Sequence, residues 1–223
     1  GVNPMVSHGH NTGMFNPAVW IKAAARRGEV WTIDPLFTET AKLSTRHIAA
    51  YPGKDYAILA WLVREIIDGG PLDAQQPVHG LDELRAALQG LDRATAAEIA
   101  GVPEQDLQDL LAAIRRKGKV VVETGTGITM SAGANLTQWF AWLLMILTGA
   151  MNRNGGAWFH PGFLAPCENV EFPVMDPWTP GSKTRPDVIG VIGDWPCAVL
   201  PDEIDAGNIR ALMNFGGRLL RAF

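Results

Sequence analysis

Short apolar segments of strand type alternate with helical segments along this chain, and this alternation constrains its fold more than any other feature. Residues 29–33 form one apolar segment, which ends at Asp34 and a proline that removes a ladder donor. Residues 119–123 form another, which ends in the glycine loop 125–127. Such alternation is typical of a doubly wound, mostly parallel sheet, which binds its ligands at the carboxyl ends of the strands.

Helix signals occupy the stretches between these segments. Residues 16–27 begin with an asparagine cap and a proline at the first helical position, and they end with two arginines. An amphipathic run over residues 55–68 predicts a second helix, which is stopped by two glycines. A third, more apolar run over residues 135–147 follows the glycine loop and is predicted to be a buried helix.

These elements predict an α/β fold, a doubly wound, mostly parallel sheet with helices on both faces, over residues 1–150. Residues 71–118 should form an all-helical excursion within it. Residues 151–223 are expected to be an extended, Gly- and Pro-rich segment that leads into a second unit, with a strand over residues 209–215. The chain starts without methionine and stops just after that strand, so we expect it to be an internal fragment of a longer protein.

Composition excludes several classes of protein. The net charge is −4 with no long basic run, which removes the electrostatic footprint of a dedicated nucleic-acid binder. The longest apolar run, residues 139–147, is too short to span a membrane. Cys167 and Cys197 cannot make a disulfide framework and are best read as plain thiols. His8 and His10 lack a third ligand at metal spacing, so no metal site is predicted.

Three loops, over residues 1–13, 33–37 and 125–130, are expected to converge at the carboxyl edge of the sheet. The first offers backbone amides near a helix start, which suits an anionic phosphate. Asp34 stands where a carboxylate accepts from a ribose hydroxyl or a base amino group. An Asp-Pro pair after a strand is also an ordinary turn, so the loops alone leave a nucleotide site and a structural role both open. The chain lacks the G-x-G-x-x-G fingerprint, which disfavours an ordinary nicotinamide site.

Seven short segments follow one another in a characteristic order and spacing. They are Gly1-Val2-Asn3-Pro4 with Ser7-His8; Asp34-Pro35 with Thr38-Glu39-Thr40-Ala41; Pro52-Gly53 with Asp55; Gly125-Thr126-Gly127-Ile128; Leu147-Thr148-Gly149 with Asn154-Gly155-Gly156; Leu200-Pro201-Asp202-Glu203-Ile204; and Ile209-Arg210-Ala211-Leu212 with Gly216-Gly217. In this order they resemble the molybdopterin oxidoreductases of the dimethyl sulfoxide reductase and formate dehydrogenase type. The resemblance covers nearly the whole chain.

The resemblance implies a dinucleotide-binding fold that helps to hold molybdenum or tungsten between two molybdopterin guanine dinucleotides. It implies cofactor contacts as follows: Gly1, Asn3, Ser7 and His8 along the pyrophosphate, Ile33 and Asp34 near ribose and guanine, Gly53 and Asp55 at the guanine edge, Thr126, Gly127 and Met130 towards the pterin, and Gly216 near the second dinucleotide. A carboxylate such as Asp55 can accept two hydrogen bonds from guanine.

No catalytic residue is implied in this chain, because the metal ligand and a 4Fe-4S cluster are expected elsewhere in the longer protein. The partners implied are the remaining domains, electron-transfer subunits and a small-molecule substrate, with formate, nitrate and sulfoxides all left open. The compartment is also open, with the cytoplasm slightly favoured over the periplasm. The chain alone is expected to be inactive.

Departures from the family pattern leave alternatives. Leu36 stands where the family usually has Arg, which removes a cation. The alternative function is a molybdenum-free electron-transfer scaffold of the same fold, as in the large iron–sulfur subunit of respiratory complexes. Asp55 has an alternative role as well, since it could serve only as the cap of the helix that follows it.

Overall fold

The structure is a computed structural model, and it describes residues 3–5, 16–70, 72–74, 77–158, 178–191 and 194–213. The chain divides into two compact units, residues 1–159 and residues 160–223. Each unit is described by itself below.

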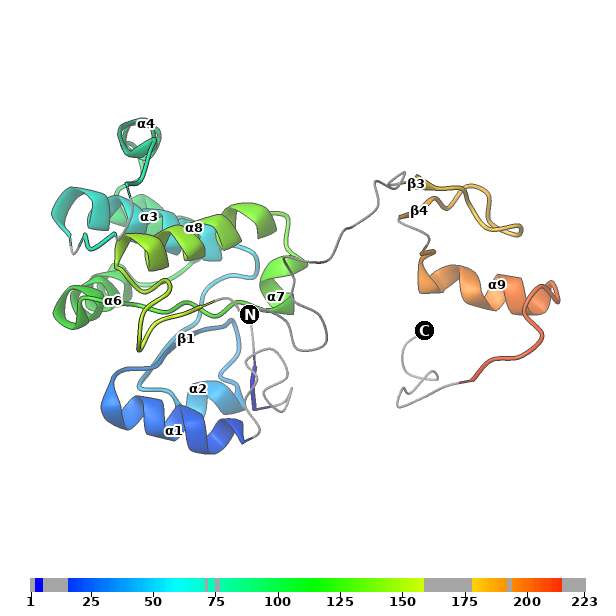
Figure 1. Cartoon of the computed structure of the whole chain (residues 1–223), viewed down its shortest axis with the longest axis horizontal. Helices are drawn as coiled ribbons and strands as arrows, with labels where there is room; N and C mark the ends of the chain where they lie inside the picture. Colours follow the sequence, from blue (N-terminus) through cyan, green and yellow to red (C-terminus); the bar gives the residue numbers. More distant parts are fainter. Residues whose placement is uncertain are drawn as a thin grey trace. The chain divides into compact units, whose positions relative to one another are not determined.

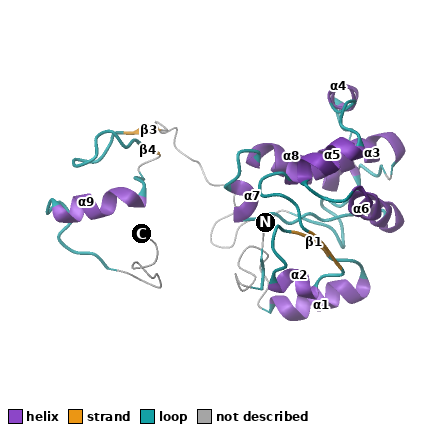
Figure 2. Cartoon of the chain, turned by 180° about the vertical axis from the view of Figure 1, so that it is seen from behind, coloured by secondary structure: helices purple, strands orange, loops and turns teal. Residues whose placement is uncertain are grey.

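Helix α3 (Asp55–Gly69) supplies much of the buried core of the first unit and is drawn in cyan in Figure 1. Its residues 57–63 are buried in succession, so this part of the helix is covered on every side, whereas Arg64, Glu65 and Asp68 give its last turns a polar side. Nine of its residues are buried, and they belong to the main hydrophobic cluster except for Ala57. Helix α8 (Ala134–Leu147) and helix α5 (Arg93–Ala100) pack against α3, as the view from behind also shows (Figure 2).

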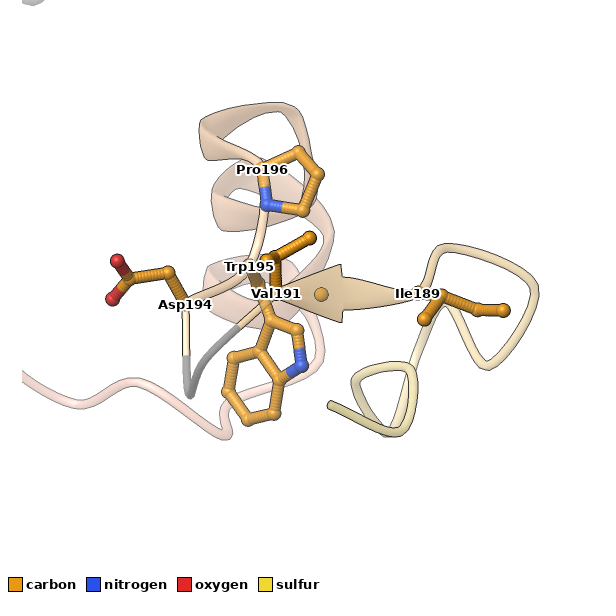
Figure 3. Close-up of a pocket in the computed structure, with 6 residues that line it drawn as sticks. Ile189, Val191, Asp194, Trp195 and Pro196 are labelled. Atoms are coloured by element: carbon orange, nitrogen blue, oxygen red, sulfur yellow. The ribbon is translucent and has the colours of Figure 1, made fainter. Parts of the chain in front are cut away.

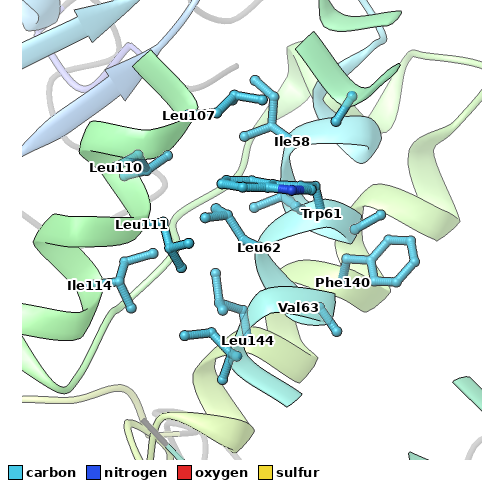
Figure 4. Packing of buried hydrophobic residues seen from close by; sticks show 14 of the residues in the cluster. Ile58, Trp61, Leu62, Val63, Leu107, Leu110, Leu111, Ile114, Phe140 and Leu144 are labelled. Carbon is cyan, nitrogen blue, oxygen red and sulfur yellow. The ribbon is translucent and has the colours of Figure 1, made fainter. Parts of the chain in front are cut away.

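The segment that we predicted to be all helical contains helix α4 (Leu81–Ala87), α5 and helix α6 (Glu104–Lys117). The apolar face of α6 points toward α3 in Figure 4, where it contributes Leu107, Leu110, Leu111 and Ile114. Arg115 on the same helix donates to the carbonyl oxygens of Glu65 (3.1 Å) and Gly70 (3.3 Å), which satisfies acceptors at the end of α3. The segment therefore supplies part of the main core.

Helix α1 (Pro17–Arg27) confirms the predicted helix and its cap, since the Asn16 side chain accepts from the Val19 amide at 3.3 Å. Strand β1 (Trp31–Ile33) follows, then helix α2 (Glu39–Leu43) and strand β2 (Arg46–Ile48). The two strands pair in parallel, with Thr32 opposite His47 and Ile33 opposite Ile48. The mixed α/β class is thus confirmed, although the only parallel pairing among the described strands is this two-stranded sheet.

The predicted strand over residues 119–123 is wrong for this structure. The segment alternates as a strand would, with Val120 and Val122 packed on the core and Val121 exposed, but it has no ladder partner among the described residues. The Val120 amide instead lies 3.4 Å from the Thr148 hydroxyl. The alternation of side chains correctly indicated that Val120 and Val122 face the core. It could not predict a strand, because a strand also needs a neighbouring strand with which to pair. The loop that follows forms helix α7 (Thr126–Thr129).

Helix α8 was predicted to be buried, and only one face of it is. Phe140 and Leu144 are almost fully buried, whereas Leu136 and Trp139 on the opposite face are exposed. Because apolar residues occur all around this helix, the sequence did not show which of its faces would be exposed. No helix in the described ranges has the length and apolar character needed to cross a membrane.

The second unit has little regular structure in its described part, as the Gly- and Pro-rich composition predicted. Strands β3 (Trp178–Thr179) and β4 (Gly190–Val191) pair antiparallel, and a short 3-10 helix, η2 (Cys197–Val199), leads into helix α9 (Leu200–Asp205). The predicted strand over residues 209–215 is wrong for residues 209–213, which lie outside any strand, and the rest falls beyond the described residues.

A buried carboxylate ties α9 to a preceding turn. Glu203 is only 7% exposed and accepts from the Thr184 amide at 2.9 Å, from the Thr184 hydroxyl at 2.7 Å and from the Asn208 side chain at 2.8 Å. The Thr184 donors, together with Ser182 and Asn208, lower the pKa of Glu203 to about 2. Hydrogen bonds to the charged form explain why this acid tolerates burial.

The central position of α3 makes a testable prediction about stability. Leu62 is 1% exposed, and Leu62→Ala should lower the free energy of unfolding by about 2–5 kcal/mol, because it leaves a cavity among α3, α6 and α8. Leu72→Ala is the matched control, since Leu72 is 51% exposed and its loss should stay within about 0.5 kcal/mol. Urea unfolding of both variants measures the difference, and equal losses would contradict a core centred on α3.

Candidate cofactor-binding site

Asp34 is held firmly at the carboxyl end of β1. Its amide donates to the Ile48 carbonyl at 3.1 Å, and its Oδ1 accepts from the Leu36 amide at 2.9 Å. The ring of His47 lies with Nε2 2.8 Å from the Asp34 carbonyl oxygen, so Nε2 must be the protonated nitrogen there. Phe37 contacts the same ring edge-on, with the two centroids 5.4 Å apart. The backbone of Asp34 is therefore fixed by its neighbours.

His47 was not predicted from the sequence, and only strand register could have revealed it. It lies opposite Thr32 in the β1–β2 pair, one position before the residue opposite Ile33. A histidine in a short apolar segment gives no local sign that it will face the carbonyl of a residue 13 positions earlier. Its role here is to orient the turn that carries Asp34.

The turn before α3 and the turn before α8 pack against one another. Gly53 has a φ of +73°, and a Cβ at this residue would lie 3.2 Å from the Cβ of Ser131. A Cβ at Gly133 would lie 3.1 Å from Cδ1 of Tyr56 and 3.7 Å from the Gly53 carbonyl oxygen. Glycine is required at residue 53 both by the left-handed φ and by this close approach. The structure thus brings Gly53 and Asp55 beside the loop that ends at Met130.

Asp55 is the first residue of α3, and its side chain is half-buried. The cap residue of the helix is Lys54, so the interpretation of Asp55 as the cap is wrong by one position. Burial raises the pKa of Asp55; its own backbone N–H and the positive charge of the chain's N-terminal amine oppose this shift, and the negative charge of Asp34 adds to it. No ion pair among the described residues includes Asp55. The carboxylates of Asp34 and Asp55 therefore lie within electrostatic range of one another.

Asn3 lies beside α2 and is already engaged in hydrogen bonds. Its Oδ1 accepts from the Thr40 hydroxyl at 2.5 Å, and its Nδ2 donates to Glu39 at 3.2 Å. The Met5 amide adds a bond to the same hydroxyl at 3.4 Å. These bonds fix Asn3 against the first turn of α2, and its Nδ2 keeps a second N–H donor.

The residues expected to face the pterin lie on one short, accessible helix and the turn after it. Thr126 and Gly127 are exposed at the start of α7, and Met130 is 83% exposed. Gly125 anchors the turn, since its carbonyl accepts from the amides of Ile128 and Thr129 at 2.9 and 3.1 Å. Four of the predicted site residues, Gly1, Ser7, His8 and Gly216, lie outside the described residues, as does Cys167.

The other described regions show few groups that could bind a ligand or a metal ion. An open hollow of about 550 Å³ in the second unit is lined mainly by apolar residues, with Trp195 beneath Val191 and the Asp194 carboxylate pointing away (Figure 3). Within the described ranges no three His, Cys, Asp or Glu side chains are grouped as metal ligands would be. Cys197 is exposed and not in a disulfide. The convergence of Asp34, Gly53 and Asp55 is therefore the candidate site.

Comparison with known proteins supports the family resemblance. No family model matches the chain. It is 28% identical over 140 residues to an assimilatory nitrate reductase from Haloferax mediterranei, an alignment that covers 61% of this chain and 18% of that protein. It is 26% identical over 109 residues to the alpha subunit of an F420-dependent formate dehydrogenase from Methanococcus maripaludis, covering 46% of this chain and 16% of the relative.

A solved structure agrees in fold. The acetylene hydratase from Pelobacter acetylenicus superposes with a TM-score of 0.53 and 20% sequence identity, over 57% of this chain and 18% of that one. The chain thus matches less than a fifth of the length of each of these proteins. All three are members of the molybdopterin oxidoreductase family, and this chain is similar to them at low identity and over part of its length.

The unpaired Asp55 makes a prediction about pH. Because its pKa is raised above 3.8, the folded chain binds more protons than the unfolded chain as pH rises through the window between the two pKa values. Stability should therefore fall across that window, and Asp55→Asn should remove the fall. We expect the variant to be at least as stable as the unchanged chain at neutral pH, measured by urea unfolding from acidic to neutral pH.

Asp92→Asn is the comparison of opposite sign for this measurement. Asp92 caps α5 by accepting from the Thr95 amide at 2.7 Å, a bond that lowers its pKa and that Asn can also make. The lowered pKa of Asp92 makes stability rise with pH, so Asp92→Asn should remove a rise where Asp55→Asn removes a fall. A clear loss of stability in Asp55→Asn at neutral pH would mean that the Asp55 carboxylate already has a stabilising partner.

Proposed function

We propose that this chain is the cofactor-binding fragment of a molybdenum or tungsten oxidoreductase that uses two molybdopterin guanine dinucleotides. The observation that carries the proposal is the half-buried carboxylate of Asp55, which forms no ion pair among the described residues and whose pKa is raised by burial, with a smaller contribution from the charge of Asp34. A buried charge without a partner is costly, and such residues are frequently ligand contacts. The names of the relatives, a nitrate reductase and a formate dehydrogenase, support the class of enzyme.

The site fits a guanine base chemically. Guanine presents N1–H and an exocyclic amine side by side, and one carboxylate can accept from both. Adenine offers an acceptor at N1, which a carboxylate would repel. The glycine at residue 53, whose Cβ would press on Ser131, allows the turn before Asp55 to pack closely on the turn before α8. Asp55 would therefore select the base, and Asp34 would accept from the ribose.

The remaining contacts of the cofactor are proposed along the same edge. Gly1, Asn3, Ser7 and His8 would lie along the pyrophosphate, and Ile33 would line the ribose. Thr126, Gly127 and Met130 would lie towards the pterin, and Gly216 would lie near the second dinucleotide. When bound, the cofactor supplies two-electron chemistry at the metal, coupled to single-electron relay. This chain binds and orients it.

The proposal also concerns the longer protein to which this chain would belong. We infer that residues 1–150 belong to a doubly wound, mostly parallel sheet with helices on both faces. We also infer that a 4Fe-4S cluster and the metal ligand lie elsewhere in the longer protein, with electron-transfer subunits as partners. We also expect residues 1–150 and 151–223 to belong to different domains. The 223-residue chain by itself should show no redox turnover with artificial electron donors or acceptors.

The experiment that tests the proposal compares the longer protein with its Asp55→Asn variant. Asparagine would turn a donor toward a guanine donor, and a charge-assisted bond lost in a buried site costs about 1.5–3 kcal/mol. Retention of the guanine dinucleotide should fall by about one to two orders of magnitude. The measurement is molybdenum, tungsten and released guanine nucleotide per protein, with Asp92→Asn as the control.

The possible results of this experiment distinguish the proposed function from its alternatives. Metal and guanine nucleotide in the unchanged protein, both reduced in Asp55→Asn, support the proposal. Equal cofactor content in both proteins would show that Asp55 does not contact the cofactor. Iron without molybdenum, tungsten or guanine nucleotide would favour the electron-transfer scaffold instead.

A further inference from the structure

Lys54 places a positive charge directly beside Asp55, on a side chain that is exposed. The two residues are consecutive, so their Cα atoms are about 3.8 Å apart. The Lys54 Nζ lies over the ring of Tyr56, 6.0 Å from the ring centroid. The face of an aromatic ring attracts a cation, but an exposed contact at this distance is weak. The ammonium group is therefore free to turn from the ring to a stronger partner.

Tyr56 connects this lysine to the loop that is expected to face the pterin. A Cβ at Gly133 would lie 3.1 Å from Cδ1 of Tyr56, so the ring packs on the turn before α8. That turn follows Met130, the last of the residues expected towards the pterin. The Lys54 ammonium thus lies between the proposed guanine contact at Asp55 and the loop that ends at Met130.

The acidic side chains of the site do not use this charge. No ion pair among the described residues includes Lys54, although Asp55 is its neighbour in sequence. Oδ1 of Asp34 accepts instead from the Leu36 amide. The cofactor contacts given above include the carboxylates of Asp34 and Asp55 but no lysine or arginine. A pyrophosphate is itself anionic, so these two carboxylates repel it unless a cation offsets them.

We propose that Lys54 binds the phosphate groups of the guanine dinucleotide, with its ammonium group donating to a pyrophosphate oxygen. This inference rests on the proposed function and extends it to the charged part of the cofactor. The pyrophosphate links the guanosine to the pterin, so in the proposed binding mode it lies between Asp55 and α7. A lysine suits that position because its ammonium is a compact charge with several donors on a flexible stem.

The alternative is that Lys54 is a solvated surface lysine. In that case its replacement changes nucleotide binding no more than the loss of any other exposed lysine does. Lys117 provides this comparison, since it is exposed in the last turn of α6. It acts electrostatically on Glu29, before the start of β1, whereas Asp34 follows the end of that strand.

The test measures the binding of guanosine diphosphate and of guanosine to the 223-residue chain by isothermal titration calorimetry. Lys54→Gln removes the charge, and Lys54→Arg keeps a charged donor at the same position. Lys117→Gln is the matched control, because it makes the same change of charge elsewhere. Adenosine diphosphate is titrated into the unchanged chain as a further comparison.

We expect Lys54→Gln to weaken the binding of guanosine diphosphate by about tenfold, as the loss of a charge-assisted hydrogen bond does. Its affinity for guanosine should stay within about twofold of the unchanged chain, because guanosine carries no phosphate. Lys54→Arg and Lys117→Gln should both keep the affinity for guanosine diphosphate.

Four results would overturn the inference about Lys54. They are an unchanged affinity of Lys54→Gln for guanosine diphosphate, an equal loss for guanosine, an equal loss in Lys117→Gln, and no binding of guanosine diphosphate by the unchanged chain. Equal affinities of the unchanged chain for guanosine and adenosine diphosphate would instead contradict the guanine site, whether or not Lys54 contacts phosphate. The proposed function is also tested separately, by the cofactor content of the longer protein.

Discussion

The burial of α3 is the constraint on which the rest of the first unit depends. Residues 57–63 are buried in succession, and an apolar stretch of this kind is stable in water only if other elements pack around it. Helices α5, α6 and α8 cover it together with Ile48 of β2, and Arg115 satisfies carbonyls at its last turn. This packing fixes both ends of α3, and the first residue of the helix is Asp55.

The candidate site follows from that fixed position. Because α3 and α8 pack side by side, the turns that precede them meet at Gly53 and Ser131. The β1–β2 pair delivers Asp34 to the same region, with its carbonyl held by His47. Asp55 therefore stands in a half-buried place where its charge is poorly compensated, and burial raises its pKa. A partly buried charge of this kind lowers stability, and such local losses of stability are common at ligand sites.

Local sequence signals predicted the elements whose causes are local. The Asn16 cap, the glycine stop of α3 and the Asp34 turn were all recognisable, because each depends on residues close in sequence. The predicted strand over residues 119–123 was wrong because a ladder needs a neighbour, which no local pattern can supply. His47 was missed for the same reason, since its contact with Asp34 depends on strand register.

The central claim is that the Asp55 carboxylate is unsatisfied until it meets a guanine base. Carbon NMR titration of its carboxyl group in the 223-residue chain tests this directly, with guanosine monophosphate added and with adenosine monophosphate as the comparison. The account predicts a pKa above the ordinary 3.8 in the free chain, which guanosine monophosphate lowers and adenosine monophosphate does not change. An ordinary pKa in the free chain, or a raised one that guanosine monophosphate leaves unchanged, would contradict it.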